Sequence, residues 1–329
     1  MNRSQFLRLL VIVCLFCLFV SCKKNHVNKR IPTVYISGVN GDTAIFWKNG
    51  VAQRLSSNFG GAANQIRVAS GAVYISGQDV NAGQDAAIYW KDGAPNFLPV
   101  RSGTISSTAR SLFVSGSDVY IAGWTLTNST LYATYWKNSN PIVVDSTNVS
   151  IFNSIVISGG SVYICGTSLL NKTNNVATWW KDGVQHVLAD VTSEARSIYV
   201  SANDVYIAGM YISGTIGLPA IWKNGELINL STNNGLAYSV TASGSNVYVA
   251  GYETVNGITT ATLWRNGSAQ HLPGGAQSSV GSSVFVSGTD VYVAGFTENN
   301  NIQRACYWKN GQLFNVGNGG SNAVSIVVQ

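Results

Sequence analysis

The segment Val119-Tyr120-Ile121-Ala122-Gly123, followed by Ala133-Thr134-Tyr135-Trp136-Lys137, is the clearest indication of the fold. The chain repeats this pair of short apolar segments seven times. The tyrosine recurs at Tyr35, Tyr74, Tyr120, Tyr163, Tyr206, Tyr248 and Tyr292, and the tryptophan at Trp47, Trp90, Trp136, Trp180, Trp222, Trp264 and Trp308. Successive tryptophans are 42 to 46 residues apart, close to the length of one four-stranded blade. The sequence therefore predicts an all-β, seven-bladed β-propeller over residues 33–329.

Each repeat predicts four antiparallel strands. The first is typified by Ala109–Ser115, the second carries the Val-Tyr pair and the third the tryptophan. The fourth ends on an apolar column at Leu55, Leu98, Val144, Leu188, Leu230, Leu272 and Val316. The chain enters the pattern at a second strand, Val34–Gly38, and leaves it at a first strand, Ala323–Gln329. We therefore expect the C-terminal strand to close the first blade, which removes open sheet edges.

Loop lengths predict one uniform end and one variable end of the ring. Within each repeat, the connection from the first strand to the second and that from the third to the fourth have a constant length. Most of the tight turns after the tryptophan strands contain Asn-Gly or Asp-Gly. The other two connections vary, with tyrosine and tryptophan 12 to 17 residues apart within a repeat. Function on such scaffolds lies on variable loops held by a rigid frame.

The order of motifs within a repeat resembles two known repeat families. An Arg-Ser-apolar strand, a Val-Tyr-Ile-Ala-Gly strand and an aromatic strand resemble the kelch repeat, and Ala-x-x-Trp-x-x-Gly followed by Leu is similar to the HAF extracellular repeats of bacteria. Both resemblances cover nearly all of residues 33–329. They imply a propeller with the first strand innermost, and they carry over no catalytic residue.

The N-terminus reads as an export signal. Arg3 and Arg8 precede twelve apolar residues, 9–20, which is too short for a helix that spans a bilayer. The sequence Leu18-Phe19-Val20-Ser21-Cys22 resembles a bacterial lipobox.

The lipobox resemblance implies that residues 1–21 are a lipoprotein signal peptide and that Cys22 is the lipidation site. Residues 22–32 would then be a polar, basic tether to a bacterial envelope membrane, and Lys23 after the cysteine favours the outer membrane. An ordinary secretory signal is the alternative.

Charge argues against a nucleic-acid partner. Of the 20 Lys and Arg residues, six lie in residues 1–32, which leaves 14 against all 14 Asp and Glu residues in the predicted propeller. A neutral propeller has no counterion-release term to drive phosphate binding. We expect a monomeric propeller that binds no nucleic acid.

The sequence offers little catalytic material. His186 and His271 fall on predicted outer strands without a serine or cysteine partner at a recognisable spacing, and no histidine cluster indicates a metal site. We therefore predict no catalytic residue, no metal and no cofactor. The alternative, a carbohydrate-active hydrolase or lyase, would use a pair of carboxylates near the variable end, drawn from Asp42, Asp79, Asp85, Asp145, Asp190, Glu194, Glu253 and Glu298.

Two repeated residue types have both a structural and a functional interpretation. The seven tryptophans could form a platform for sugars, but their fixed spacing is typical of wedges between blades. The seven turn cations could meet an anionic partner, or they could be ordinary solvated turn residues. They are Lys48, Lys91, Lys137, Lys181, Lys223, Arg265 and Lys309.

The preferred binding site is the channel mouth at the variable end. In each first strand, the residue two positions before the leading apolar residue, which is Leu112 in Ala109–Ser115, is mainly polar. These residues are Asn64, Arg110, Asn153, Arg196, Tyr238, Ser282 and Val324. After the glycine of the second strand, four repeats carry a large apolar residue: Trp124, Met210, Tyr252 and Phe296.

Aromatic side chains beside convergent hydrogen-bonding groups suit a glycan or an extended peptide. The sequence thus favours a membrane-anchored envelope module that binds or scaffolds a protein, peptide or glycan. The same side chains could instead simply cover the ends of the blades.

Overall fold

The computed structural model describes residues 31–55, 60–128, 130–145, 150–170, 174–202, 204–274 and 276–329. Thr33–Gln329 form one compact unit. The described part of the chain is built from strands and contains no helix, hence none that could cross a bilayer. The predicted signal peptide, the lipidation site Cys22 and all but the last two residues of the tether lie outside the described residues.

The first sheet has the order β28-β1-β2-β3, which joins the two ends of the unit. Its strands are β28 (Ser321–Val328), β1 (Val34–Asn40), β2 (Thr43–Lys48) and β3 (Val51–Arg54). Strand β28 pairs antiparallel with β1, with Tyr35 opposite Val327 and Ile36 opposite Ile326. The prediction that the C-terminal strand completes the first blade is confirmed.

Four further sheets each contain four consecutive antiparallel strands. One consists of β4 (Ala62–Ala69), β5 (Ala72–Asn81), β6 (Gln84–Lys91) and β7 (Ala94–Phe97). The next consists of β8 (Thr104–Ser115), β9 (Asp118–Thr127), β10 (Thr130–Lys137) and β11 (Asn140–Asp145). Then follow β12 (Ser150–Ser158), β13 (Ser161–Leu170), β14 (Asn174–Lys181) and β15 (Val184–Val187), and β16 (Ser193–Ser201), β17 (Asp204–Ser213), β18 (Ile216–Lys223) and β19 (Glu226–Asn229).

The remaining eight strands form one sheet. They are β20 (Gly235–Ser243), β21 (Asn246–Val255), β22 (Ile258–Arg265), β23 (Ser268–His271), β24 (Ser278–Ser287), β25 (Asp290–Asn299), β26 (Ile302–Lys309) and β27 (Gln312–Gly319). A single parallel pair, Thr259 opposite Ser278, joins β22 to β24. A propeller of four-stranded antiparallel sheets is thus confirmed, with five separate sheets and one larger sheet.

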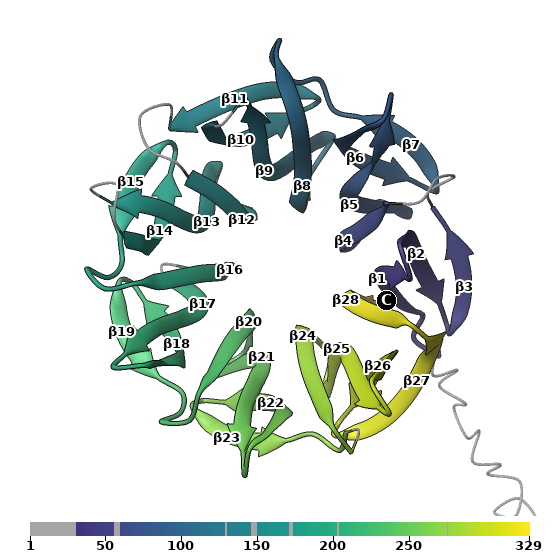
Figure 1. The fold of residues 1–329 in the computed structure, drawn as a ribbon, viewed down its shortest axis with the longest axis vertical. Coiled ribbons are helices and arrows are strands. Elements are labelled where there is room, and N and C mark those ends of the chain that lie inside the picture. The colour runs from purple at the N-terminus through teal and green to yellow at the C-terminus, as the bar shows by residue number, and fades with distance from the viewer. Residues whose placement is uncertain are drawn as a thin grey trace, which may run out of the picture. The chain divides into compact units, whose positions relative to one another are not determined.

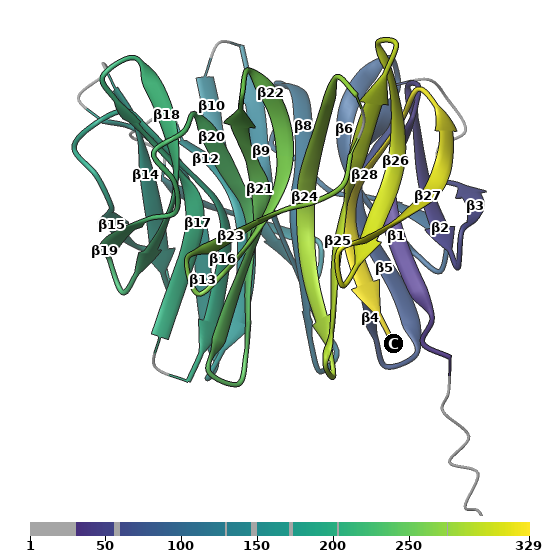
Figure 2. The ribbon, with the colours of Figure 1, turned by 90° about the horizontal axis from the view of Figure 1, so that it is seen from below.

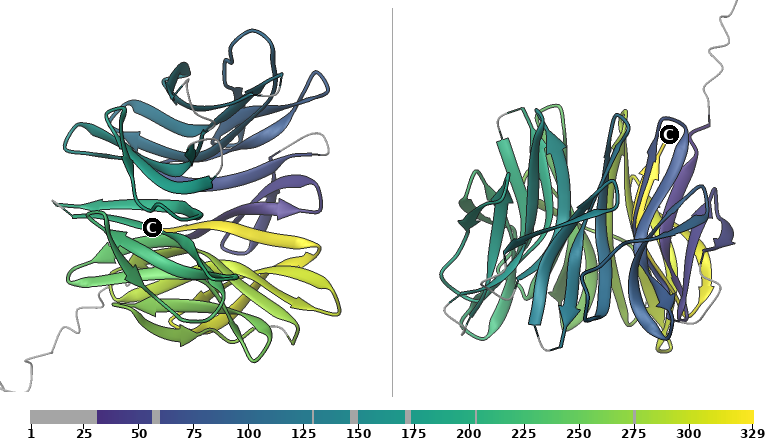
Figure 3. Two further views of the ribbon diagram at one scale, coloured as in Figure 1. Left: turned by 60° about the vertical axis from the view of Figure 1, so that its left-hand side comes forward. Right: turned by 90° about the horizontal axis from the view of Figure 1, so that it is seen from above.

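The sheets of Thr33–Gln329 stand in a ring, with β4, β8, β12, β16, β20, β24 and β28 nearest the centre (Figure 1). Each of these innermost strands contacts the next one, and β28 contacts β4, so the ring is closed. Seen from the side, the sheets are strongly twisted and their strands run between the two ends of the ring (Figure 2). The two further views in Figure 3 show the same stacking of neighbouring sheets.

The hydrophobic core lies between neighbouring sheets. All seven repeated tryptophans are at most 2% exposed. Trp136, for example, packs in one cluster with Tyr74 and Leu98 of the preceding sheet. The tryptophans are therefore wedges between sheets, as their constant spacing predicted.

The turns after the tryptophan strands are held by one repeated set of bonds. The side-chain oxygen of the turn Asn or Asp accepts a hydrogen bond from the first valine of the neighbouring second strand, as Asn138 does from the Val119 N–H at 2.9 Å. This turn residue has a left-handed backbone, with φ of 50° at Asn138, a conformation that Asn and Asp tolerate.

Each turn cation lies over the ring of the repeated tyrosine, at 5.2 to 5.6 Å from its centroid. Lys137 also pairs with Asp118 at 3.2 Å, and the same pair recurs in two other repeats. Hydrogen bonds from Asn138 and Lys137 hold the pKa of Asp118 below its usual value. These contacts favour the interpretation of the seven turn cations as structural turn residues rather than as a site for an anionic partner.

Candidate functional site

A β-bulge interrupts every innermost strand at the same place. In β8, Ala109 is opposite Gly123 and Ser111 is opposite Ala122, which leaves Arg110 as the extra residue. The corresponding extra residues of the seven strands are Asn64, Arg110, Asn153, Arg196, Tyr238, Ser282 and Val324. A bulge bends its strand and redirects the extra side chain. The polar column predicted from spacing is therefore the column of bulged residues.

The repeated glycine of the second strand makes room for the bulge. A Cβ placed on Gly209 would overlap the carbonyl oxygen of Glu194 and lie 2.9 Å from its carbonyl carbon. The same overlap with a carbonyl oxygen of the innermost strand occurs at Gly38, Gly77, Gly123, Gly166, Gly251 and Gly295. Glycine is needed here for close backbone approach rather than for a left-handed backbone.

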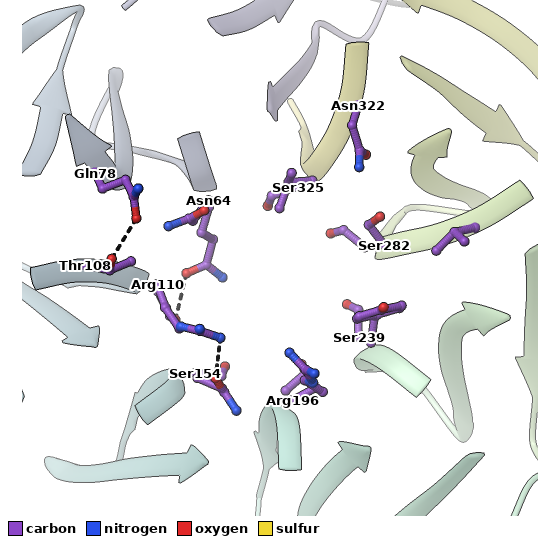
Figure 4. A pocket seen from close by; sticks show the side chains of 18 of the residues that line it. Asn64, Gln78, Thr108, Arg110, Ser154, Arg196, Ser239, Ser282, Asn322 and Ser325 are labelled. Carbon is purple, nitrogen blue, oxygen red and sulfur yellow. Dashed lines mark hydrogen bonds between the residues drawn. The ribbon is translucent and has the colours of Figure 1, made fainter. Parts of the chain in front are cut away.

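The bulged residues line a cavity of about 540 Å³, which we call the funnel. Each innermost strand contributes its bulged residue and the residue after it, and the second set comprises Gln65, Ser111, Ser154, Ser197, Ser239, Ser283 and Ser325. The lining is completed by Gln78, Thr108, Trp124, Val280, Phe296 and Asn322. Figure 4 shows these side chains converging from strands on several sides of the ring.

The funnel contains most of the predicted site. Asn64, Arg110, Asn153, Arg196, Tyr238, Trp124 and Phe296 all line it. Met210 and Tyr252 are not among its lining residues. The Met210 side chain lies over Gly217, where no side chain competes for the space. Tyr252 packs instead against Tyr238, with ring centroids 6.1 Å apart.

The residues after the bulges were not predicted, although serine at six of the seven positions was a signal that could have found them. They bond one innermost strand to the next. The Ser111 hydroxyl accepts a hydrogen bond from the Ile155 N–H at 3.0 Å, and the Gln65 side chain accepts one from the Leu112 N–H at 2.6 Å. Similar bonds involve the serines of four more strands. The funnel wall is thereby tied together around the axis.

A chain of hydrogen bonds links three innermost strands. Arg110 donates to the Asn153 side-chain oxygen at 2.9 Å, and Asn153 donates to the Ala195 carbonyl at 2.7 Å. Arg196 pairs with Glu194 of its own strand and lies 5.8 Å from the centroid of the Tyr238 ring. Both guanidinium groups are therefore held in place by neighbouring residues. Figure 4 shows Arg110 and Arg196 on the wall of the funnel.

The charge of the funnel is positive. Its described lining includes two arginines and no Asp or Glu. Burial, and then the positive charge of Arg196, lowers the pKa of Arg110, while Glu194 opposes this effect. Two guanidinium groups with only one carboxylate beside them favour an anionic ligand.

Three residues that line the funnel carry buried polar atoms without a hydrogen-bond partner. The Arg196 Nε, the Trp124 Nε1 and the Asn322 Oδ1 are buried and make no hydrogen bond, and all three residues line the cavity. Buried polar groups are normally hydrogen-bonded. Two unused donors and one unused acceptor therefore mark places where a ligand could bind.

A second polar cluster lies outside the funnel around the buried carboxylate of Glu253. His271 Nε2 lies 2.7 Å from Glu253 Oε1, and Ser231 donates to Glu253 Oε2. Burial pushes the pKa of Glu253 up, but hydrogen bonds from Ser231, His271 and Asn233 outweigh it and hold the pKa below its usual value. Because the carboxylate lies between the serine and the histidine, this is not the arrangement of a catalytic triad.

His186, Cys165 and Cys306 lie on strands of the frame, with His186 exposed and the two cysteines buried. His186 stacks on Trp179 with centroids 4.3 Å apart. Cys165 and Cys306 are free and buried, and burial raises the pKa of both thiols. Among the residues with described positions, no group of three or more His, Cys, Asp or Glu could hold a metal ion.

No protein-family model matches this chain, and no curated protein matches it in sequence. Solved structures do match its fold. The acylaminoacyl peptidase of Pyrococcus horikoshii matches with a TM-score of 0.53 at 10% identity, over 87% of this chain and 50% of the peptidase. A puromycin hydrolase matches with a TM-score of 0.61 at 8% identity, over 88% of this chain and 52% of the hydrolase. The chain thus spans about half the length of either protein.

These matches correct the function predicted from sequence. The interpretation as a module that binds or scaffolds a protein, peptide or glycan rather than an enzyme is wrong, because the matched structures are a peptidase and a hydrolase. The alternative of a carbohydrate-active enzyme is corrected in the same direction. The repeats encode a frame that accepts many activities, so they could not distinguish these functions. At 8 to 10% identity the likeness itself establishes the fold.

Proposed function

We propose that residues 33–329 are a peptidase-like propeller whose funnel controls the access of short peptides to a hydrolytic site. The observation that carries this proposal is the closed ring of bulged residues around one polar cavity of about 540 Å³. A cavity of this size accepts a small ligand and excludes a folded protein. The peptidase and the hydrolase with the same fold support the assignment to peptide hydrolysis.

The proposal includes seven blades. The eight-stranded sheet is then two blades, β20–β23 and β24–β27, that touch through the single pair of Thr259 and Ser278. Both halves have the same bulge, after Ala237 and after Gly281. The kelch-like and HAF-like identity of the repeats remains a prediction from their motifs.

The hydrolytic groups are assigned to a part of the assembly outside residues 33–329. About half of each matched protein lies outside the region that this chain covers. Within the described residues, His186 stacks on Trp179 and His271 bonds to Glu253, so both imidazoles are already engaged. The propeller would act by admitting peptides and limiting their size.

The test is hydrolysis by the assembly that contains this chain. A tagged chain is isolated with its native partners, and cleavage of an N-acetylated tripeptide and of a folded protein is followed by mass spectrometry. Ser282→Trp should obstruct the funnel and slow tripeptide cleavage. The bulge should accept the large side chain, because Tyr238 occupies the corresponding position of β20.

Ser117→Trp, on the exposed turn between β8 and β9, is the matched control and should leave cleavage unchanged. Tripeptide cleavage that does not accompany the tagged chain, or that Ser282→Trp leaves at the original rate, would contradict the proposal.

We further propose that lipid on Cys22 anchors this propeller to a bacterial envelope membrane. The lipobox-like sequence 18–22 supports this localisation. Cys22→Ser should prevent palmitate labelling and release the chain from the membrane fraction. An unlabelled wild-type chain would contradict it.

A further inference from the structure

The charge in the funnel is concentrated on one side. Arg110 and Arg196 extend from β8 and β16, which flank β12. The bulged residues of β24 and β28 are the uncharged Ser282 and Val324. An anionic group that enters the funnel is therefore attracted toward the arginine side.

The amount of charge selects a singly charged group. Two guanidinium groups carry two positive charges, and Glu194, paired with Arg196, offsets one of them. One negative charge from a ligand then neutralises the site. A carboxylate supplies one charge and two acceptor oxygens, which match the paired N–H groups of a guanidinium.

The unpartnered atoms complete the binding pattern. The Arg196 Nε–H is buried and lacks an acceptor, and the Asn322 Oδ1, contributed by β28, is buried and lacks a donor. A carboxylate oxygen would satisfy the first atom, and an amide N–H would satisfy the second. Trp124 and Phe296 in the lining add apolar surface for side chains.

We infer that the funnel binds the free C-terminal carboxylate of a short peptide through Arg110 and Arg196, with a peptide N–H donated to Asn322. This inference deepens the proposed function and rests on it, because it names which end of the peptide enters. Arg110 and Arg196 bind the substrate carboxylate, and Asn153 and Glu194 position them.

Two peptides of one sequence test the inference. The probes are N-acetyl-Ala-Ala-Ala with a free carboxylate and the same tripeptide with a C-terminal amide, titrated calorimetrically into the full chain. Loss of a charge-assisted hydrogen bond should weaken binding of the amide about tenfold or more. Arg110→Gln should weaken binding of the acid and remove the difference between the two probes.

Arg101→Gln is the matched control, because Arg101 is exposed and lies over the Tyr132 ring outside the funnel. It should preserve the difference between acid and amide. Thermal unfolding of each variant shows whether the fold is retained, and Arg196→Gln provides a second test if Arg110→Gln is unstable. Acetate and inorganic phosphate are competitors, and phosphate should compete no better than acetate.

Equal binding of acid and amide, or binding of neither, would overturn the inference. It would also be overturned by a preference that survives both arginine substitutions, or by phosphate displacing the peptide more effectively than acetate. The proposed function is judged separately, since it depends on cleavage by the assembly. If cleavage accompanies the chain but the funnel binds the free-carboxylate peptide no better than the amide, only the inference about the C-terminal carboxylate is refuted.

Discussion

Gly209→Ala tests whether the glycine opposite a bulge is what permits the funnel to form. The added Cβ would overlap the Glu194 carbonyl oxygen and lie 3.2 Å from the Ala195 Cα. Both are backbone atoms, so the overlap cannot be relieved by a side-chain rotation. Overpacking of this kind costs about 1–3 kcal/mol, and the disturbed strand pairing adds about 1 kcal/mol. We expect the free energy of unfolding to fall by about 3 kcal/mol.

Urea and thermal unfolding followed by circular dichroism measure this effect. For a domain of this size the loss corresponds to a decrease in Tm of roughly 5 °C. Gly214→Asn is the matched control in the same hairpin, because Gly214 has a φ of 62° and nothing near its Cβ position, and Asn tolerates that backbone. An unchanged Tm for Gly209→Ala would refute the role given to the repeated glycine.

Three further substitutions test the bonds between and within the sheets. Ser111→Ala leaves the buried Ile155 N–H without its acceptor and should lower the free energy of unfolding by about 1–2 kcal/mol in urea titrations. A loss below about 0.5 kcal/mol would argue that the serines after the bulges do not hold neighbouring innermost strands together. Trp136→Ala empties a fully buried wedge and should cost about 3–5 kcal/mol in the same assay, unless neighbouring sheets close the space. Glu253→Gln should destabilise the protein at neutral pH. The pKa of Glu253 is lower in the folded protein than in the unfolded chain, so its carboxylate stabilises the fold at any pH above the unfolded pKa. This stabilisation is lost as the pH falls through the folded pKa. The difference in Tm between Glu253→Gln and wild type should therefore shrink as the pH falls below the pKa of Glu253 in the unfolded chain. A constant difference would show that the bond to His271 does not depend on the charge.

Much of the fold could be predicted because each repeat encodes it locally. The Val-Tyr strand, the tryptophan strand and the turn that follows them recur at nearly constant spacing, and strand alternation and turn chemistry act over a few residues. The closure by β28 also followed from the order of strands. The number of separate sheets did not, because the pair of Thr259 and Ser278 depends on how two neighbouring repeats meet in space.

Seven of the nine predicted binding residues line the funnel, but the reason that they meet there was not predicted. Counting back from each first strand found Arg110 and Asn153, but strand periodicity alone gives no reason for them to point at the axis. The extra residue of each bulge does so, and the bulge arises from backbone pairing. Met210 does not line the funnel, because its side chain fills the space over Gly217, a neighbour on another strand.

The repeated strands, the wedges and the turns could be predicted from the amino-acid sequence, since they depend on residues close together in the chain. Which side chains share the funnel depends on the three-dimensional arrangement of the repeats. Asn153 lies 43 residues after Arg110 and 43 residues before Arg196. The three residues meet because ring closure brings three successive innermost strands together around one axis. Their hydrogen bonds and the unpartnered atoms beside them depend on that closure, so the chemistry of the site could not be obtained from any one repeat.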